Sequence, residues 1–130
     1  MPGEGNNPKA WLLRAKGSLA RANAGRLAPE VLYEDLCFDA QQAAEKALKA
    51  LLLACKRPFP KTHDIGLLLQ QLVAAGIDVP EEVCAAEVLS FYAVVTRYPG
   101  DYPDLDEAAY LEALELARRV VAWVEAQLEC

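Results

Sequence analysis

The chain has 130 residues, of which 54% are hydrophobic and 25% are charged, so its length and composition predict one folded domain rather than a disordered chain. The formal net charge is -6, and this acidity argues against RNA as a partner, because sequence-independent binding of nucleic acid depends on neutralising phosphates. The apolar runs are far shorter than the roughly 20 residues that cross a membrane, and the N-terminus lacks the segments of a signal peptide, so we expect a cytoplasmic protein.

The first predicted element is a helix over residues 8–24, because Pro8 suits the first position of a helix and Gly25 suits the residue that ends it. Residues 1–7 before it are expected to be disordered. The helix places three polar side chains on a face separate from its apolar stripe, namely Arg14, Ser18 and Arg21.

The second predicted helix spans residues 29–56 and is the longest of the chain. Its alanine-rich apolar stripe predicts close packing against another helix. Glu45 and Lys49 have the i,i+4 spacing of a favourable ion pair. One polar face of this helix carries Asp35, Asp39, Gln42, Lys46 and Lys49.

The third predicted helix is short and spans residues 63–75, with Thr62 as its cap and Asp64 near its positive end. The fourth begins at Pro80 and continues to about Arg97. Its spacing predicts that it buries Cys84, Val88, Phe91 and Val95.

The fifth predicted helix begins after Asp104, because Asp104 and Glu107 have the spacing of a capping box. Its apolar positions recur at intervals of four and three residues, at Tyr110, Leu114, Ala117, Val121, Val124 and Leu128. Four long helices and one short helix predict an all-α, up-down antiparallel helical bundle, in a single domain over residues 8–130. The width of the last apolar face favours a homodimer, although a five-helix core also accounts for it.

The sequence provides no basis for a metal site or a cofactor. The only histidine is His63, and no C-x-x-C pair occurs among Cys37, Cys55, Cys84 and Cys130. Glycine-rich phosphate loops and the G-x-S-x-G nucleophile motif are also missing. His63 has two interpretations, a general base or a packing residue held by Asp64, and the second is favoured because a helix N-terminus disfavours a charged imidazolium.

The charged residues are unevenly distributed. Residues 1–61 hold ten Lys and Arg against six Asp and Glu, which gives +4. Residues 62–130 hold three Arg against thirteen Asp and Glu, which gives -10. The basic half is able to accept one phosphate-bearing ligand or to take part in head-to-tail self-association, and chance asymmetry of solvated helix faces is the alternative.

The segment TRYPGDYPDLDE, residues 96–107, separates the last two predicted helices. Pro99, Gly100 and Pro103 predict a rigid turn. Arg97 is a lone cation among acids and aromatic residues, a setting that suits a fixed, hydrogen-bonded guanidinium. The spacing alone leaves two interpretations open, a structural connector and a binding site.

Four stretches of the chain, in order, resemble the HEPN domain family, whose helical domains are often encoded beside minimal nucleotidyltransferases. The stretches are KAWLLRAKGSLARA (9–22), YEDLCFDAQQAAEKALKALL (33–52), KTHDIGLLLQQL (61–72) and TRYPGDYPD (96–104) with the helix after it. The likeness covers residues 9–128 and implies an up-down bundle that dimerises, with the Arg-bearing segment near the dimer cleft.

Ribonuclease members of this family carry Arg-x(4–6)-His, in which the His acts in RNA cleavage and the Arg steadies the phosphate. Counted from Arg97, the positions for that His hold Tyr102, Pro103 and Asp104. Tyrosine, with an ordinary pKa near ~10, is a poor general base at neutral pH. The chain therefore resembles the type without the ribonuclease histidine, and we expect that it is not an enzyme.

The resemblance implies a non-catalytic HEPN domain that is the partner or regulatory subunit of a minimal nucleotidyltransferase and binds a nucleotide or phosphate. Arg97 would hold the phosphate, Tyr98 or Tyr102 would contact the base, and Lys46 and Lys49 would add positive charge. Tyr102 is also the candidate acceptor of a nucleotide from the partner. Two alternatives stay open: a divergent metal-independent ribonuclease toxin of a toxin–antitoxin pair, and an interaction bundle with no ligand.

Overall fold

The computed structural model describes residues 7–95 and 103–129, and these residues form helices and no strand. The predicted all-α fold is therefore confirmed. In chain order the elements are α1 (Pro8–Asn23), α2 (Tyr33–Ala54), α3 (Ile65–Ala74), α4 (Glu81–Cys84), the 3-10 helix η2 (Ala85–Leu89), α5 (Ser90–Val95) and α6 (Glu107–Glu129). The predicted disorder before α1 concerns residues of which all but Asn7 lie outside the described part, so it stays a prediction.

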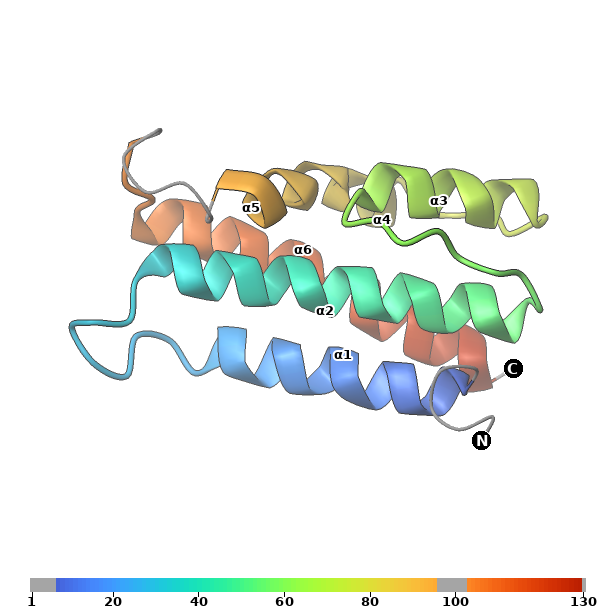
Figure 1. Ribbon diagram of the computed structural model, residues 1–130, viewed down its shortest axis with the longest axis horizontal. Helices are drawn as coiled ribbons and strands as arrows, with labels where there is room; N and C mark the ends of the chain where they lie inside the picture. Colours follow the sequence, from blue (N-terminus) through green and yellow to red (C-terminus); the bar gives the residue numbers. More distant parts are fainter. Residues whose placement is uncertain (1–6, 96–102, 130) are drawn as a thin grey trace.

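The helices form a bundle in which α2 and α6 make the middle layer (Figure 1). On one side this layer is covered by α1, and on the other by α3 and the α4–η2–α5 run. Thirteen of the 22 residues of α2 are buried, which makes it the central helix. No helix in the described ranges is both long enough and apolar enough to cross a membrane.

Local signals fix the ends of α1 and the start of α2. The Asn7 side chain accepts from the backbone N–H of Lys9 at 3.0 Å, and the positive φ of Gly25 follows the C-cap, as predicted. The start of α2 is at residue 33, not at the predicted residue 29. It is delayed because Arg26 donates to the carbonyls of Pro29 and Val31 and so holds a turn there.

The chain returns along α2 before α3 begins, so that α3 runs in the same direction as α2 rather than against it (Figure 1). This path brings His63 back to the middle of α2, where it contacts Glu45. The predicted cap of α3 is wrong: Asp64 is the N-cap and accepts from Leu67 N at 3.2 Å. Thr62 instead accepts from Asp64 N at 3.0 Å, because it lies too early in the chain to reach the first turn.

The predicted fourth helix is a run of three segments, and its predicted buried face is wrong. The side chains of Cys84, Val88 and Phe91 are exposed, and that of Val95 lies outside the described residues. The buried side chains step by three, at Val83, Ala86 and Leu89. A 3-10 helix has three residues per turn, so Ala86 and Leu89 share one face of η2, and Val83 in the preceding α4 continues that face.

The last helix confirms its predicted apolar stripe: five positions are buried and Leu128 is partly buried. Its cap is Asp106, which accepts from Ala109 N at 2.9 Å, and not the predicted Asp104. Asp106 directly precedes the first helical residue and is therefore the side chain in capping position. The hydroxyl of Tyr110 donates to the carbonyl of Ala22 at 2.6 Å and joins α6 to α1.

Candidate functional site

The predicted site residues divide into two groups. Lys46 and Lys49 lie on α2 and are described, whereas Arg97, Tyr98 and Tyr102 lie outside the described residues. The site is therefore built from α2 and the elements that contact its polar side chains.

Three cationic side chains of α1 and α2 lie near one another, and we call Arg14, Arg21 and Lys46 the cationic cluster. The Lys46 ammonium donates to the Ser18 hydroxyl at 3.1 Å, and the Arg21 guanidinium is 3.5 Å from the same oxygen. Ser18 is fully buried, so its hydroxyl holds the Lys46 ammonium and the Arg21 guanidinium at one place in the contact between α1 and α2. The two polar faces predicted separately for the first and second helices are thus in contact.

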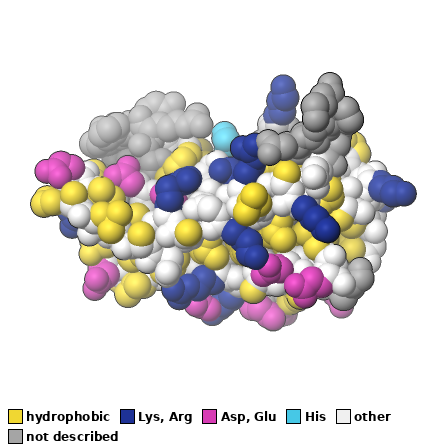
Figure 2. Space-filling view, turned by 90° about the horizontal axis from the view of Figure 1, so that it is seen from below, with side chains coloured by type: hydrophobic (Ala, Val, Ile, Leu, Met, Phe, Trp, Pro, Cys, Tyr) yellow, Lys and Arg dark blue, Asp and Glu magenta, His cyan; other side chains and the backbone are white. Residues whose placement is uncertain are grey.

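The cationic cluster contains one ion pair among the described residues. Arg21 pairs with Asp39 at 3.2 Å. Partial burial, and then the positive charge of Arg21, lower the pKa of Lys46; Arg14 adds to this effect, and the nearby carboxylates oppose it without outweighing it. A lowered lysine pKa means that the site disfavours its own positive charge, and an anion bound there would relieve this. Figure 2 shows Lys and Arg side chains gathered on one face of the molecule, with Asp and Glu mainly along its edges.

Lys49 lies in a different environment, inside a hydrogen-bonded network around the buried Glu45. The predicted pair is confirmed, with 2.8 Å between the Lys49 ammonium and one Glu45 oxygen. The other oxygen is 2.8 Å from Nδ1 of His63 and accepts from the Gln41 amide at 2.9 Å. The ammonium also lies over the rings of Trp11 and Phe59, at 5.8 and 5.1 Å from their centres.

The Glu45 carboxylate is stabilised by this network. Burial on its own would raise the pKa of Glu45, but hydrogen bonds from Lys49, Gln41 and His63 outweigh burial and hold the pKa below its ordinary value. The carboxylate is therefore charged at neutral pH and balances Lys49. It also fixes the position of the His63 ring, whose partner is Glu45 rather than the predicted Asp64.

A cavity of about 500 Å³ opens beside His63, between the start of α3 and α5. It is lined by Thr62, His63, Asp64, Ser90, Phe91 and Val94. Sequence alone offers no reason to group these residues, because α3 and α5 meet only in the fold. The partnership of Gln41, Glu45 and Lys49 did have a signal, since they are spaced four residues apart on α2.

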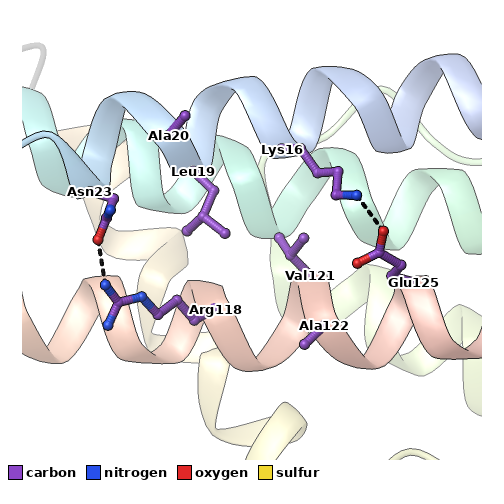
Figure 3. Close-up of a pocket in the computed structure, with 8 residues that line it drawn as sticks. All are labelled: Lys16, Leu19, Ala20, Asn23, Arg118, Val121, Ala122 and Glu125. Carbon is purple, nitrogen blue, oxygen red and sulfur yellow. Dashed lines mark hydrogen bonds and ion pairs between the residues drawn. The ribbon is translucent and has the colours of Figure 1, made fainter.

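A second hollow of about 450 Å³ lies between α1 and α6 (Figure 3). Its floor is apolar, formed by Leu19 and Val121. Its two ends are closed by side-chain contacts across the groove, Lys16 with Glu125 and Arg118 with Asn23 (Figure 3). Because Lys16 already has a carboxylate partner, this groove is less suited to an anion than the cationic cluster.

Comparison with known proteins gives a consistent result. The model of the HEPN domain family matches residues 8–127. The crystal structure of TT1696 from Thermus thermophilus is similar, with a TM-score of 0.80, 37% sequence identity, and coverage of 93% of this chain and 98% of that one. ST0689, described as an archaeal HEPN homologue, has a TM-score of 0.71 and 26% identity, over 93% of this chain and 97% of its own. No curated protein matches.

Proposed function

Because the chain belongs to the HEPN domain family, we propose that it acts without catalysis of its own, as the partner or regulatory subunit of a minimal nucleotidyltransferase, and that it binds a nucleotide through its phosphate groups. The observation that carries the binding proposal is the cationic cluster. Arg14, Arg21 and Lys46 converge there, with Asp39 as the carboxylate in direct contact with Arg21. Guanidinium groups match the geometry of phosphate oxygens, and an ammonium adds a point charge.

The tyrosines and the arginine after α5 belong to this proposal as predictions from sequence. Arg97 would add a further phosphate ligand, and Tyr98 or Tyr102 would contact the base. The absence of catalysis is proposed because Tyr102, Pro103 and Asp104 occupy the positions where the ribonuclease motif needs histidine. Tyr102 stays the candidate for modification by the partner enzyme.

A homodimer is part of the same proposal. The α4–η2–α5 run buries one face in the core, whereas Val88, Phe91 and Val94 on its outer side are 58, 46 and 60% exposed. Exposed apolar side chains that cluster in this way mark interaction surfaces, so this outer face suits a second copy of the chain. Light scattering on Val88→Asp is expected to give one chain per particle where the native protein gives two. If the native protein is itself monomeric, the proposed homodimer is wrong.

Calorimetric titration with ATP, GTP and AMP tests the nucleotide site. We expect at least one of them to bind, and the double variant Arg21→Gln/Lys46→Gln to bind it about tenfold or more weakly, because charge-assisted hydrogen bonds are worth about 1.5–3 kcal/mol. Arg119→Gln is the control: it also removes a positive charge, but Arg119 lies on α6 and pairs with Glu115. Equal affinities of the double variant and the native protein would exclude the cationic cluster as the site.

The proposed partnership has its own test. Co-expression with a nucleotidyltransferase encoded next to this chain, followed by purification through a tag on one partner, is expected to yield both proteins together. Recovery of each protein alone, under conditions where both are folded, would contradict the partnership without bearing on the nucleotide site.

A further inference from the structure

Two aromatic side chains line the cavity beside His63. One is the imidazole of His63 itself, which is about half exposed and is held in place by the buried Glu45 at 2.8 Å. The other is Phe91, which is also about half exposed and belongs to the outer face proposed for the homodimer, so the cavity borders that face. Aromatic faces of this kind stack on nucleobases with little dependence on sequence.

The polar groups of the cavity offer hydrogen bonds in defined directions. Asp64 uses Oδ1 to accept from Leu67 N, and its Oδ2 has no hydrogen bond to any residue in the described ranges. The hydroxyls of Thr62 and Ser90 accept from the backbone N–H groups of Asp64 and Ile65, at 3.0 and 2.8 Å. Each hydroxyl therefore keeps its proton for a ligand. The cavity presents one carboxylate acceptor and two hydroxyl donors.

The charge of this cavity separates it from the cationic cluster. No Lys or Arg is among its described lining residues, and Asp64 would repel a phosphate. The two sites are nevertheless close along α2, because Glu45 holds His63 while the adjacent Lys46 belongs to the cationic cluster.

We propose that the cavity beside His63 binds the base of a purine nucleotide, with the ring stacked between His63 and Phe91 and its exocyclic amino group donating to Asp64. This inference rests on the proposed nucleotide binding and adds the identity of the base. Adenine has the amino group that Asp64 requires, whereas hypoxanthine presents a carbonyl oxygen at the same place. A carboxylate accepts from the first and repels the second.

The test compares adenosine and inosine monophosphates, which differ at this one group. By calorimetry, the native protein is expected to bind the adenine nucleotide about tenfold more tightly, as one hydrogen bond to a charged group allows. In Asp64→Asn the preference is expected to reverse, because the amide oxygen still caps α3 while its NH₂ group donates to the carbonyl of hypoxanthine. The ratio of the two affinities is the readout, since loss of the negative charge strengthens binding of both nucleotides.

Phe91→Ala is expected to weaken binding of the adenine nucleotide about tenfold and to leave the affinity for inorganic pyrophosphate unchanged, because pyrophosphate has no base to stack. Val88→Ala is the control: it lies on the same apolar face but does not line the cavity, and it corrects for any change in oligomeric state.

Equal binding of the two nucleotides to the native protein, or a preference that Asp64→Asn leaves unchanged, overturns this inference. If pyrophosphate still binds in those cases, the phosphate site stands and only the base site is wrong. If neither nucleotide nor pyrophosphate binds, the proposed nucleotide binding is wrong and this inference fails with it.

Discussion

Lys46 and Lys49 lie within one turn of α2, yet they belong to two regions of the molecule with opposite electrostatic character. Lys49 is buried with a carboxylate at 2.8 Å and two aromatic rings around it. Lys46 shares its surroundings with Arg21 and Arg14 and donates to a neutral hydroxyl. The same residue type therefore has a carboxylate at ion-pair distance in one region and a neutral hydroxyl as its hydrogen-bond partner in the other.

Spacing on a polar helix face does not determine what each lysine of that face does. Lys46 and Lys49 were both predicted to add positive charge to a phosphate site, because sequence spacing places them near each other. Contact with Glu45 makes Lys49 part of the folded framework, and contact with Arg21 leaves Lys46 as the better candidate for a ligand. Variants that remove one member of each region should separate stability from binding.

Glu45→Ala is expected to have the largest effect. It leaves the Lys49 ammonium buried without its carboxylate, and breaking a buried pair in this way costs about 3–5 kcal/mol in the free energy of unfolding. Urea denaturation at neutral pH measures this. Glu115→Ala is the matched control, because it breaks the exposed i,i+4 pair with Arg119, which is worth about 0.5 kcal/mol or less. Similar losses in the two variants would contradict the framework role of Glu45.

Acidic pH should weaken the same network by protonating Glu45. Because the pKa of Glu45 is held below its ordinary value in the folded state, its contribution is present above the unfolded pKa and is lost as pH falls through the folded pKa. The difference in unfolding free energy between the native protein and Glu45→Gln is therefore expected to narrow from about pH 6 to about pH 3. A difference that stays constant over this range would mean that Glu45 is not charged in the fold.

The sequence predicted the features that depend on local signals. The bounds of α1 and the apolar stripe of α6 follow from helix period, proline and glycine, and the structure confirms them. The buried face of the fourth helix could not be chosen from sequence, because apolar residues occur on both faces and the 3-10 segment changes the period.

The candidate site was predictable in its parts but not in its assembly. The polar faces of the first two helices were visible as patterns, whereas their contact at Ser18 required the packing of α1 on α2. The meeting of His63 with Glu45 depends on the return of the chain along α2, which helix propensity does not determine. Arg97, Tyr98 and Tyr102 stay predictions because they lie outside the described residues.

Lys46→Met is expected to have the smallest effect on stability, and to raise the free energy of unfolding where Glu45→Ala lowers it. Since the pKa of Lys46 is lowered on folding, its positive charge costs stability below the folded pKa, and removing it should raise the free energy of unfolding by up to about 0.5 kcal/mol. Lys16→Met is the control and should lower the free energy of unfolding slightly, because the pair with Glu125 is lost.

Pyrophosphate should raise the melting temperature of the native protein and of Lys16→Met more than that of Lys46→Met, because a ligand stabilises the fold only as far as it binds. If Lys46→Met is stabilised by pyrophosphate as much as the native protein, the ammonium of Lys46 has no part in anion binding, and the contrast between the two lysines is one of stability alone.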